Sequence, residues 1–195
     1  VSIHGRFRVV TERTLFAMPE TGIGFFPDVG GGYFLPRCPG KIGMYLGLTG
    51  ARIKAADCLY AGLATHGAES AKLDAIKNAL ASAAWDGDGF ATAEDILNKH
   101  ETPFGSAPLS EIRSEIDHCF AGDSVAAIFE ALRNAASAFG TETLETLLGK
   151  SPTSLCVSFE QIRQGSDMSL AEVLNMEYRM SQRMVCKPDL FEGVR

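Results

Sequence analysis

The stretch from Met18 to Gly32 reads MPETGIGFFPDVGGG and holds two acidic side chains, Glu20 and Asp28. Pro19 and Pro27 fix the backbone just before each acid, while the glycines permit positive φ angles and close approach of other groups. Each acid also follows a run of apolar residues. Burial in such surroundings raises the pKa of a carboxyl toward neutrality, as general acid or base catalysis requires. The stretch is therefore compatible with a catalytic role for either acid.

The residues alone leave a structural interpretation of the same acids open. In that interpretation Glu20 caps a turn, and Asp28 caps a helix that follows Val29. The glycines also raise the possibility of a nucleotide site, which their spacing excludes. A phosphate-binding loop ending at Gly40-Lys41 requires a glycine where this chain has Leu35. The dinucleotide fingerprint fails as well, because no Gly-x-Gly pair in the stretch is followed three residues later by glycine or alanine.

Composition excludes several classes of protein. The chain has 195 residues, enough for one core with a helical extension, and a formal net charge of -6. This charge and the lack of a basic run argue against a nucleic-acid partner, and no apolar run is long enough to predict a membrane span.

The cysteines and histidines predict neither a metal site nor disulfides. The five cysteines are scattered without C-x-x-C spacing, so we expect buried, unreactive thiols in a reducing compartment. The four histidines lie in no recognisable catalytic context, and we expect surface or structural roles for them. The residues concerned are Cys38, Cys58, Cys119, Cys156 and Cys186, and His4, His66, His100 and His118.

The first part of the chain, residues 1–68, has the pattern of a small α/β region. Strands are predicted over residues 6–10 and 14–18, which should pair or lie side by side, and over residues 63–66. Helices are predicted over residues 41–49, with Gly50 as a left-handed cap, and over residues 55–61.

Residues 69–195 have a helical pattern throughout. Trp85 to Gly89 is a turn-rich break, and three helices are expected to begin after Thr92, Ser110 and Ser124. The last third has clear capping signals. These are Ser151-Pro152 before a helix that runs to Gln164 and stops at Gly165, and the capping box from Ser169 to Glu172.

The stretch from Met18 to Arg37, with its Met-Pro-Glu-Thr and Phe-Pro-Asp-Val-Gly-Gly-Gly elements, resembles the signature of the 3-hydroxyisobutyryl-CoA hydrolases. These enzymes are a branch of the crotonase (enoyl-CoA hydratase/isomerase) superfamily. A general crotonase has Pro-Gly-Ala-Gly-Gly where this chain has Pro-Asp-Val-Gly-Gly, so Asp28 favours the hydrolase branch. The resemblance continues at residues 48–54, 61–66, 151–155, 176–182 and 191–195.

The resemblance implies an α/β fold, namely the C-terminal part of the crotonase fold. It implies hydrolysis of the thioester of 3-hydroxyisobutyryl-CoA, or of a similar short 3-hydroxyacyl-CoA, in valine catabolism. Glu20 would attack the thioester to give a mixed anhydride or would activate water, and Asp28 would orient the water or the 3-hydroxyl group. The partner is then an acyl-CoA substrate, and no separate cofactor is expected because CoA is part of that substrate. The expected compartment is the cytoplasm in a bacterium and the mitochondrial matrix in a eukaryote.

The chain is expected to be a C-terminal fragment, because it begins at Val1 rather than at an initiator methionine. In the family that it resembles, both backbone donors of the oxyanion hole precede the position of Val1. We therefore expect the 195-residue piece by itself to lack useful thioesterase activity, and its exposed sheet edge and helix faces to favour self-association.

Two other functions stay open from the sequence. An enoyl-CoA hydratase or isomerase shares the fold, although Asp28 argues against that assignment. A non-catalytic fragment or binding module is the alternative of a different class.

Overall fold

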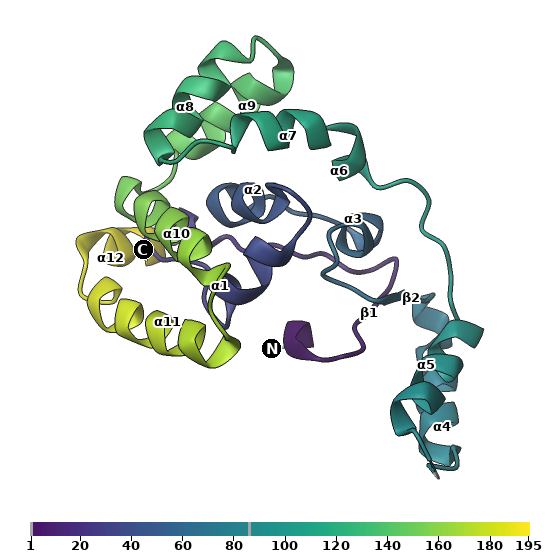
Figure 1. The fold of residues 1–195 in the computed structure, drawn as a ribbon. Coiled ribbons are helices and arrows are strands. Elements are labelled where there is room, and N and C mark those ends of the chain that lie inside the picture. Colours follow the sequence, from purple (N-terminus) through teal and green to yellow (C-terminus); the bar gives the residue numbers. More distant parts are fainter. Residues whose placement is uncertain (1, 86) are drawn as a thin grey trace. The chain divides into compact units, whose positions relative to one another are not determined.

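Helices make up most of the computed structural model, which describes residues 2–85 and 87–195 (Figure 1). By its internal contacts the chain forms two units, each built from two separate segments. Unit 1 consists of residues 1–16 and 53–110, and unit 2 of residues 17–52 and 111–195. The division that the sequence pattern predicts, between residues 68 and 69, stays a prediction. Val1 and Asp86, on which the expected chain start and part of the expected break depend, lie outside the described residues.

Unit 1 holds the two strands, and they pair differently from the expectation. β1 (Val9–Val10) pairs in parallel with β2 (His66–Gly67), with Val9 opposite His66. Phe16 instead forms an isolated antiparallel bridge with Ile53. The prediction that residues 6–10 and 14–18 lie side by side as strands is therefore wrong. Local β-propensity marks a segment as extended but does not choose its partner.

Two helices of unit 1, α4 (Leu73–Ser82) and α5 (Gly89–Lys99), pack on a small apolar cluster. Ile76 of α4 and Leu97 of α5 are buried there with Ala68. The helix expected after Thr92 begins earlier, because the Asp88 side chain accepts hydrogen bonds from the first backbone N–H groups of α5. The other helical elements of unit 1 are η1 (Ser2–His4), α3 (Ala55–Tyr60) and η4 (Ser70–Lys72). A further short helix, α6 (Pro108–Glu111), begins in unit 1 and ends on the first residue of the second segment of unit 2.

Unit 2 contains the stretch from Met18 to Gly32 and the C-terminal helices. Within it α10 (Pro152–Gly165) packs against α1 (Gly31–Phe34) and α2 (Ile42–Thr49), α11 (Leu170–Met184) packs against α1, and α12 (Pro188–Val194) packs against η2 (Glu20–Ile23). Its elements are η2 (Glu20–Ile23), α1 (Gly31–Phe34), η3 (Leu35–Arg37), α2 (Ile42–Thr49), α7 (Arg113–Cys119), α8 (Val125–Asn134), α9 (Ala138–Leu148), α10 (Pro152–Gly165), α11 (Leu170–Met184) and α12 (Pro188–Val194).

Most of the predicted helix ends in unit 2 are confirmed. Ser124 and Ser151 cap α8 and α10, and Ser169 and Glu172 form the full capping box of α11. Gly50 ends α2 in the left-handed conformation. The start predicted after Ser110 is wrong, since Ser110 lies inside α6, a separate four-residue helix ahead of α7.

Gly165 was expected to stop its helix, but it is the last residue of α10. A Cβ atom at this position would overlap the carbonyl oxygen of Gly32. Glycine is required here by close packing between α10 and α1, because any side chain would push the two segments apart.

The expectation of five buried thiols is correct for three of them. Cys38, Cys58 and Cys119 are buried, and burial raises the pKa of each thiol. Cys156 and Cys186 are exposed, which corrects the prediction for them. All five are free.

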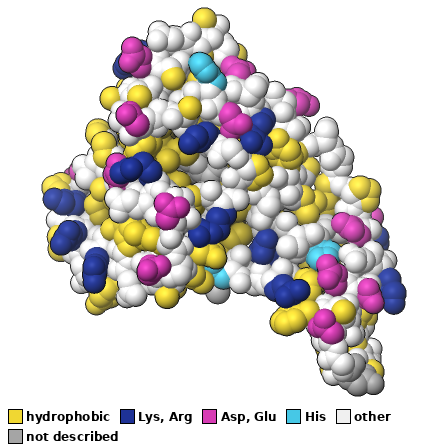
Figure 2. Space-filling model, viewed as in Figure 1, with side chains coloured by type: hydrophobic (Ala, Val, Ile, Leu, Met, Phe, Trp, Pro, Cys, Tyr) yellow, Lys and Arg dark blue, Asp and Glu magenta, His cyan; other side chains and the backbone are white. Residues whose placement is uncertain are grey.

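The sequence predicts neither a nucleic-acid partner nor a membrane span. Acidic and basic side chains are interspersed on the face shown in Figure 2. Within the part of the chain that is described, no helix has both the length and the apolar character needed to span a bilayer.

Candidate active site

Glu20 is the first residue of η2, a turn held from several sides. The hydroxyl of Thr21, which is fully buried, donates to the carbonyl oxygen of Leu48 at 3.0 Å. Phe25 N–H donates to the carbonyl oxygen of Glu20 at 3.0 Å, and Gly24 closes the turn with φ +74°. The backbone of Glu20 is thus fixed against the core of unit 2, while its side chain is half-buried.

The environment of Glu20 favours its neutral form. Burial raises the pKa of its carboxyl to about 7, its own backbone N–H opposes the shift, and the negative charge of Asp28 adds to it. One carboxyl oxygen, Oε2, is buried without a hydrogen-bond partner among the described residues. A carboxyl that changes charge near neutral pH is suited to act as base, acid or nucleophile.

Asp28 lies at the start of a strained turn. Val29 has φ +50° and Gly30 has φ +87°, so two consecutive residues are left-handed. This conformation is unfavourable for a β-branched residue such as Val29, and strain of this kind is often found at functional sites. The carbonyl oxygen of Asp28 accepts from Gly31 N–H at 2.8 Å, which leads the chain directly into α1.

Neither acid has the capping role that the structural interpretation assigned to it. The N-cap residue of α1 is Gly30, and the N-cap of η2 is Pro19, each without a side-chain cap hydrogen bond. The structure instead brings the two acids near enough that the charge of Asp28 affects the pKa of Glu20. Gly30 is the N-cap residue of α1, and Gly31 and Gly32 are its first two residues. The N–H groups of Gly30 and Gly32 are already bonded within the protein.

Those two N–H groups are bonded to a third acid, Glu177, which the sequence did not single out as functional. Glu177 lies in α11 and is 5% exposed. Its carboxylate oxygens accept from Gly30 N–H at 2.8 Å and from Gly32 N–H at 3.0 Å. Gln161 of α10 donates to the same carboxylate at 2.9 Å and to the carbonyl oxygen of Pro27 at 2.6 Å.

Burial raises the pKa of Glu177, hydrogen bonds from Gly30, Gly32 and Gln161 oppose the rise, and the charge of Asp28 adds to it. Asp28 therefore acts electrostatically on both Glu20 and Glu177.

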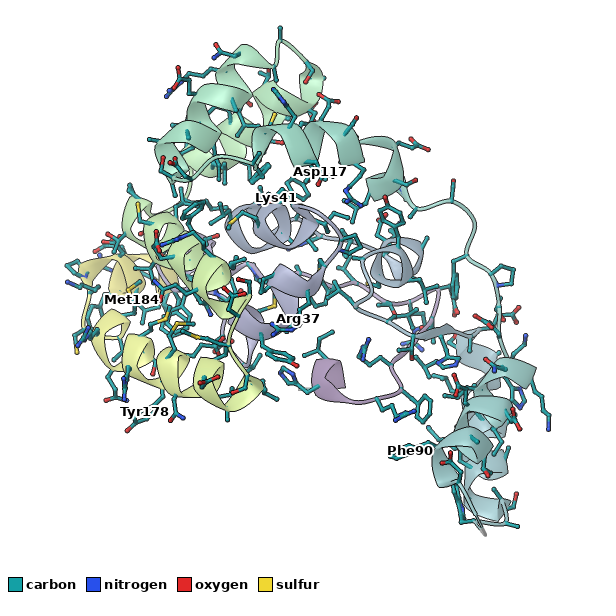
Figure 3. The ribbon with its side chains drawn as sticks, viewed as in Figure 1. Arg37, Lys41, Phe90, Asp117, Tyr178 and Met184 are labelled. Carbon is teal, nitrogen blue, oxygen red and sulfur yellow. The ribbon has the colours of Figure 1, made fainter. Side chains whose placement is uncertain are left out.

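A spacing signal for Glu177 does exist in the sequence. Val173, Glu177 and Met184 are the buried residues of α11 and fall on one helix face, so the acid takes an inward position. The neighbouring Tyr178 points away from the helix packing and is 67% exposed (Figure 3). Hydrophobicity alone would bury the tyrosine and expose the acid, which is why Glu177 is easily missed.

The buried histidine and the metal-ligating residue types remain to be placed. His66 is buried, and its Nδ1 is 2.8 Å from the Thr65 hydroxyl, which matches a satisfied structural histidine. Across residues 2–85 and 87–195, no group of three or more His, Cys, Asp or Glu side chains is arranged to hold a metal ion.

Comparison with known proteins agrees with the motif around Glu20 and Asp28. Curated relatives named mitochondrial 3-hydroxyisobutyryl-CoA hydrolase are 48% identical over 200 residues in Xenopus tropicalis and 44% identical over 200 residues in Homo sapiens. Each alignment covers 100% of this chain and 51% of the relative. The chain thus spans about half the length of these relatives.

Solved structures with the same fold include a dehydratase and a hydratase that are named for CoA thioesters. A carnitinyl-CoA dehydratase from Mycobacterium thermoresistibile is 40% identical with a TM-score of 0.90, covering 100% of this chain and 55% of that one. An enoyl-CoA hydratase from Rhodobacter sphaeroides 2.4.1 is 33% identical with a TM-score of 0.83, covering 99% of this chain and 54% of that one. The model of the enoyl-CoA hydratase/isomerase family matches residues 1–195, so the chain belongs to that family.

Proposed function

We propose that the full-length protein hydrolyses the thioester of 3-hydroxyisobutyryl-CoA or of a similar short 3-hydroxyacyl-CoA. The observation that carries this proposal is the pair of Glu20, whose pKa is raised to about 7, and Asp28, which follows Pro27 in place of the glycine of general crotonases. The names of the curated relatives support the same substrate.

In this mechanism Glu20 reacts in its ionised form. Its carboxylate either attacks the thioester carbonyl carbon, expelling the CoA thiolate and leaving a mixed anhydride for water to cleave, or takes a proton from the attacking water. Asp28 orients that water or the 3-hydroxyl group of the substrate. The partly dry setting of Glu20 favours both routes, because an ionised carboxylate that is poorly solvated is more reactive.

Replacement of Glu20 by glutamine tests the proposal. In the full-length protein Glu20→Gln should lower kcat for release of free CoA by about 100- to 10,000-fold, the range for loss of a positioned acid or base. Glu142→Gln, on the exposed side of α9, is a matched control and should retain full activity. Wild-type activity in Glu20→Gln would refute a catalytic role for Glu20.

A hydratase or isomerase is the second candidate, because the two solved structures named above carry dehydratase and hydratase names. The two activities leave different products. Hydrolysis releases a free thiol from a 3-hydroxyacyl-CoA, whereas hydration consumes the ultraviolet absorbance of an enoyl-CoA without releasing thiol. Absorbance loss without thiol release would favour the second candidate over the first.

The same proposal also covers the substrate class, the cofactor and the compartment. The substrate is an acyl-CoA, and no separate cofactor is required. The compartment is the mitochondrial matrix if the source is a eukaryote, in line with the relatives' names, and the cytoplasm if it is a bacterium.

The 195-residue chain by itself is proposed to self-associate. Phe191 and Val194 of α12 and Leu148 of α9 are all more than half exposed, and apolar residues of this size favour association when they are uncovered. A monomeric elution volume on size-exclusion chromatography would contradict this.

A further inference from the structure

The turn that carries Asp28 is held on both sides by one pair of buried side chains. Gln161 binds the carbonyl oxygen of Pro27, immediately before Asp28, and Glu177 binds the N–H of Gly30, two residues after it. Gln161 and Glu177 also bind each other at 2.9 Å. The backbone before Asp28 and the backbone after it are therefore hydrogen-bonded to the same buried pair, Gln161 and Glu177.

This connection holds a conformation that the local sequence does not favour. Val29 has φ +50°, which a β-branched residue adopts only when its surroundings impose it. α1 also begins without a side-chain cap of its own, and the Glu177 carboxylate occupies its first N–H groups instead. A carboxylate that accepts two backbone N–H bonds is strongly bound, because such bonds are charge-assisted.

We propose that Glu177 is a positioning residue, which holds the Asp28 turn in its reactive place through Gly30, Gly32 and Gln161. Glu177 does not touch the substrate in this role, and its kinetic effect passes through Asp28. The kinetic part of this proposal rests on the proposed function, while the turn itself can be tested without any substrate.

Hydrogen–deuterium exchange in the full-length protein tests the turn directly. In Glu177→Gln an NH2 group replaces one of the two carboxylate oxygens, which bind Gly30 and Gly32 separately, so one of these backbone donors faces another donor and loses its acceptor. The peptide covering residues 26–35 should then exchange about tenfold faster or more, as expected for loss of a hydrogen bond to a charged group. Glu145→Gln, exposed on α9, is the control and should leave this peptide unchanged. Unchanged exchange in Glu177→Gln would overturn the proposal.

A double-mutant cycle separates positioning from general destabilisation. Glu177→Gln should lower kcat for thioester hydrolysis by about 10- to 100-fold with little change in KM. In an Asp28→Asn background the same substitution should cost less than about threefold, because its effect passes through Asp28. An equal loss in both backgrounds would assign Glu177 a purely structural role and overturn the proposal.

Two further variants keep the test decisive. If Glu177→Gln does not fold, Gln161→Met removes the bond to Pro27 and one bond to Glu177 while filling a similar volume, and the same cycle applies.

Val29→Gly should restore part of the activity lost in Glu177→Gln, because glycine adopts the positive φ without strain. No restoration would contradict the role of turn strain. If the wild type releases no CoA from the thioester, the proposed function fails, and the exchange experiment still tests the turn.

Discussion

At the residue scale, the site depends on how differently the protein treats three acids. Glu20 is half-buried with one oxygen unpartnered among the described residues, whereas Glu177 is more deeply buried and bonded at both oxygens. An unpartnered carboxyl keeps its proton more readily and is available for chemistry, while a fully bonded one is suited to hold structure. The negative charge of Asp28 raises the pKa of both Glu20 and Glu177.

The pH dependence of hydrolysis should follow Glu20. In the proposed mechanism the ionised carboxylate reacts, so kcat/KM for thioester hydrolysis by the full-length protein should rise with pH and reach half its maximum near the raised pKa, about 7. Asp28→Asn removes a negative charge that raises this pKa, so the midpoint should move to lower pH. The move should be partial, since burial is the larger cause. A pH profile of both proteins measures this, and an upward move of the midpoint would contradict it.

Stability should change with the same group, in the opposite direction to activity. The folded pKa of Glu20 is raised from 4.5 to about 7, so the folded state binds the proton more tightly and loses stability as pH rises through this window. The glutamine of Glu20→Gln does not ionise, so the variant does not lose stability in this way as pH rises. It should therefore raise Tm more at about pH 8 than at about pH 5. Thermal melts of Glu20→Gln and Glu142→Gln at both pH values provide the comparison, and an equal shift at both would argue against this linkage.

At the element scale, some helix ends are fixed by residues within one turn of the end, and others are fixed by packing against another helix. The capping box of α11 is local, since Ser169 and Glu172 lie within one turn. Ser169→Ala should cost about 1 kcal/mol of the free energy of unfolding. Gln182→Ala, exposed on the same helix, should change it by less than about 0.5 kcal/mol. Denaturant titration measures both, and equal effects would show that the cap contributes nothing specific.

Gly165 is an end set by packing. Gly165→Ala places a Cβ atom against the Gly32 carbonyl oxygen, so α10 and α1 must separate, and we expect a loss of about 2 kcal/mol or more. Gly149→Ala is the matched control. Its nearest neighbour would lie at 3.5 Å and its φ is −81°, so it should be neutral or slightly stabilising. Equal stability of the two variants would contradict the packing explanation.

Arg37 shows how such packing is reinforced (Figure 3). Its guanidinium stacks over the ring of Tyr33 at 3.7 Å and donates to the carbonyl oxygens of Gly165 and Met168. Planar stacking and several directed donors together suit arginine rather than lysine at this position. The end of α10 is therefore tied to the segment that carries the site.

At the scale of the whole molecule, each unit combines segments far apart in the sequence. The helices α10 and α11 pack on α1, which belongs to residues 17–52. Residues 69–195 alone would lack these partners and expose the buried faces of both helices. We expect that fragment to show no cooperative thermal transition in near-ultraviolet circular dichroism, in contrast to the 195-residue chain. A sharp transition in the fragment would show that residues 17–52 are dispensable for packing.

Much of the candidate site follows from the sequence alone. Glu20 and Asp28, the left-handed cap at Gly50, and the caps at Ser124, Ser151 and Ser169 all depend on residues that are close together in the chain. The motif around the two acids also indicates the family, because it combines residue types and spacing that few folds share.

Only the tertiary structure decided the rest. β1 pairs with β2 across more than fifty residues, and Glu177 reaches a turn 147 positions before it. Neither choice has a local cause, since propensity and capping act within a few residues, whereas strand partners and buried hydrogen bonds depend on which surfaces meet after collapse. The sequence by itself therefore determined the motif that carries Glu20 and Asp28 and the caps of several helices of unit 2, whereas the packing of α10 and α11 on α1 determined how the turn of Asp28 is held.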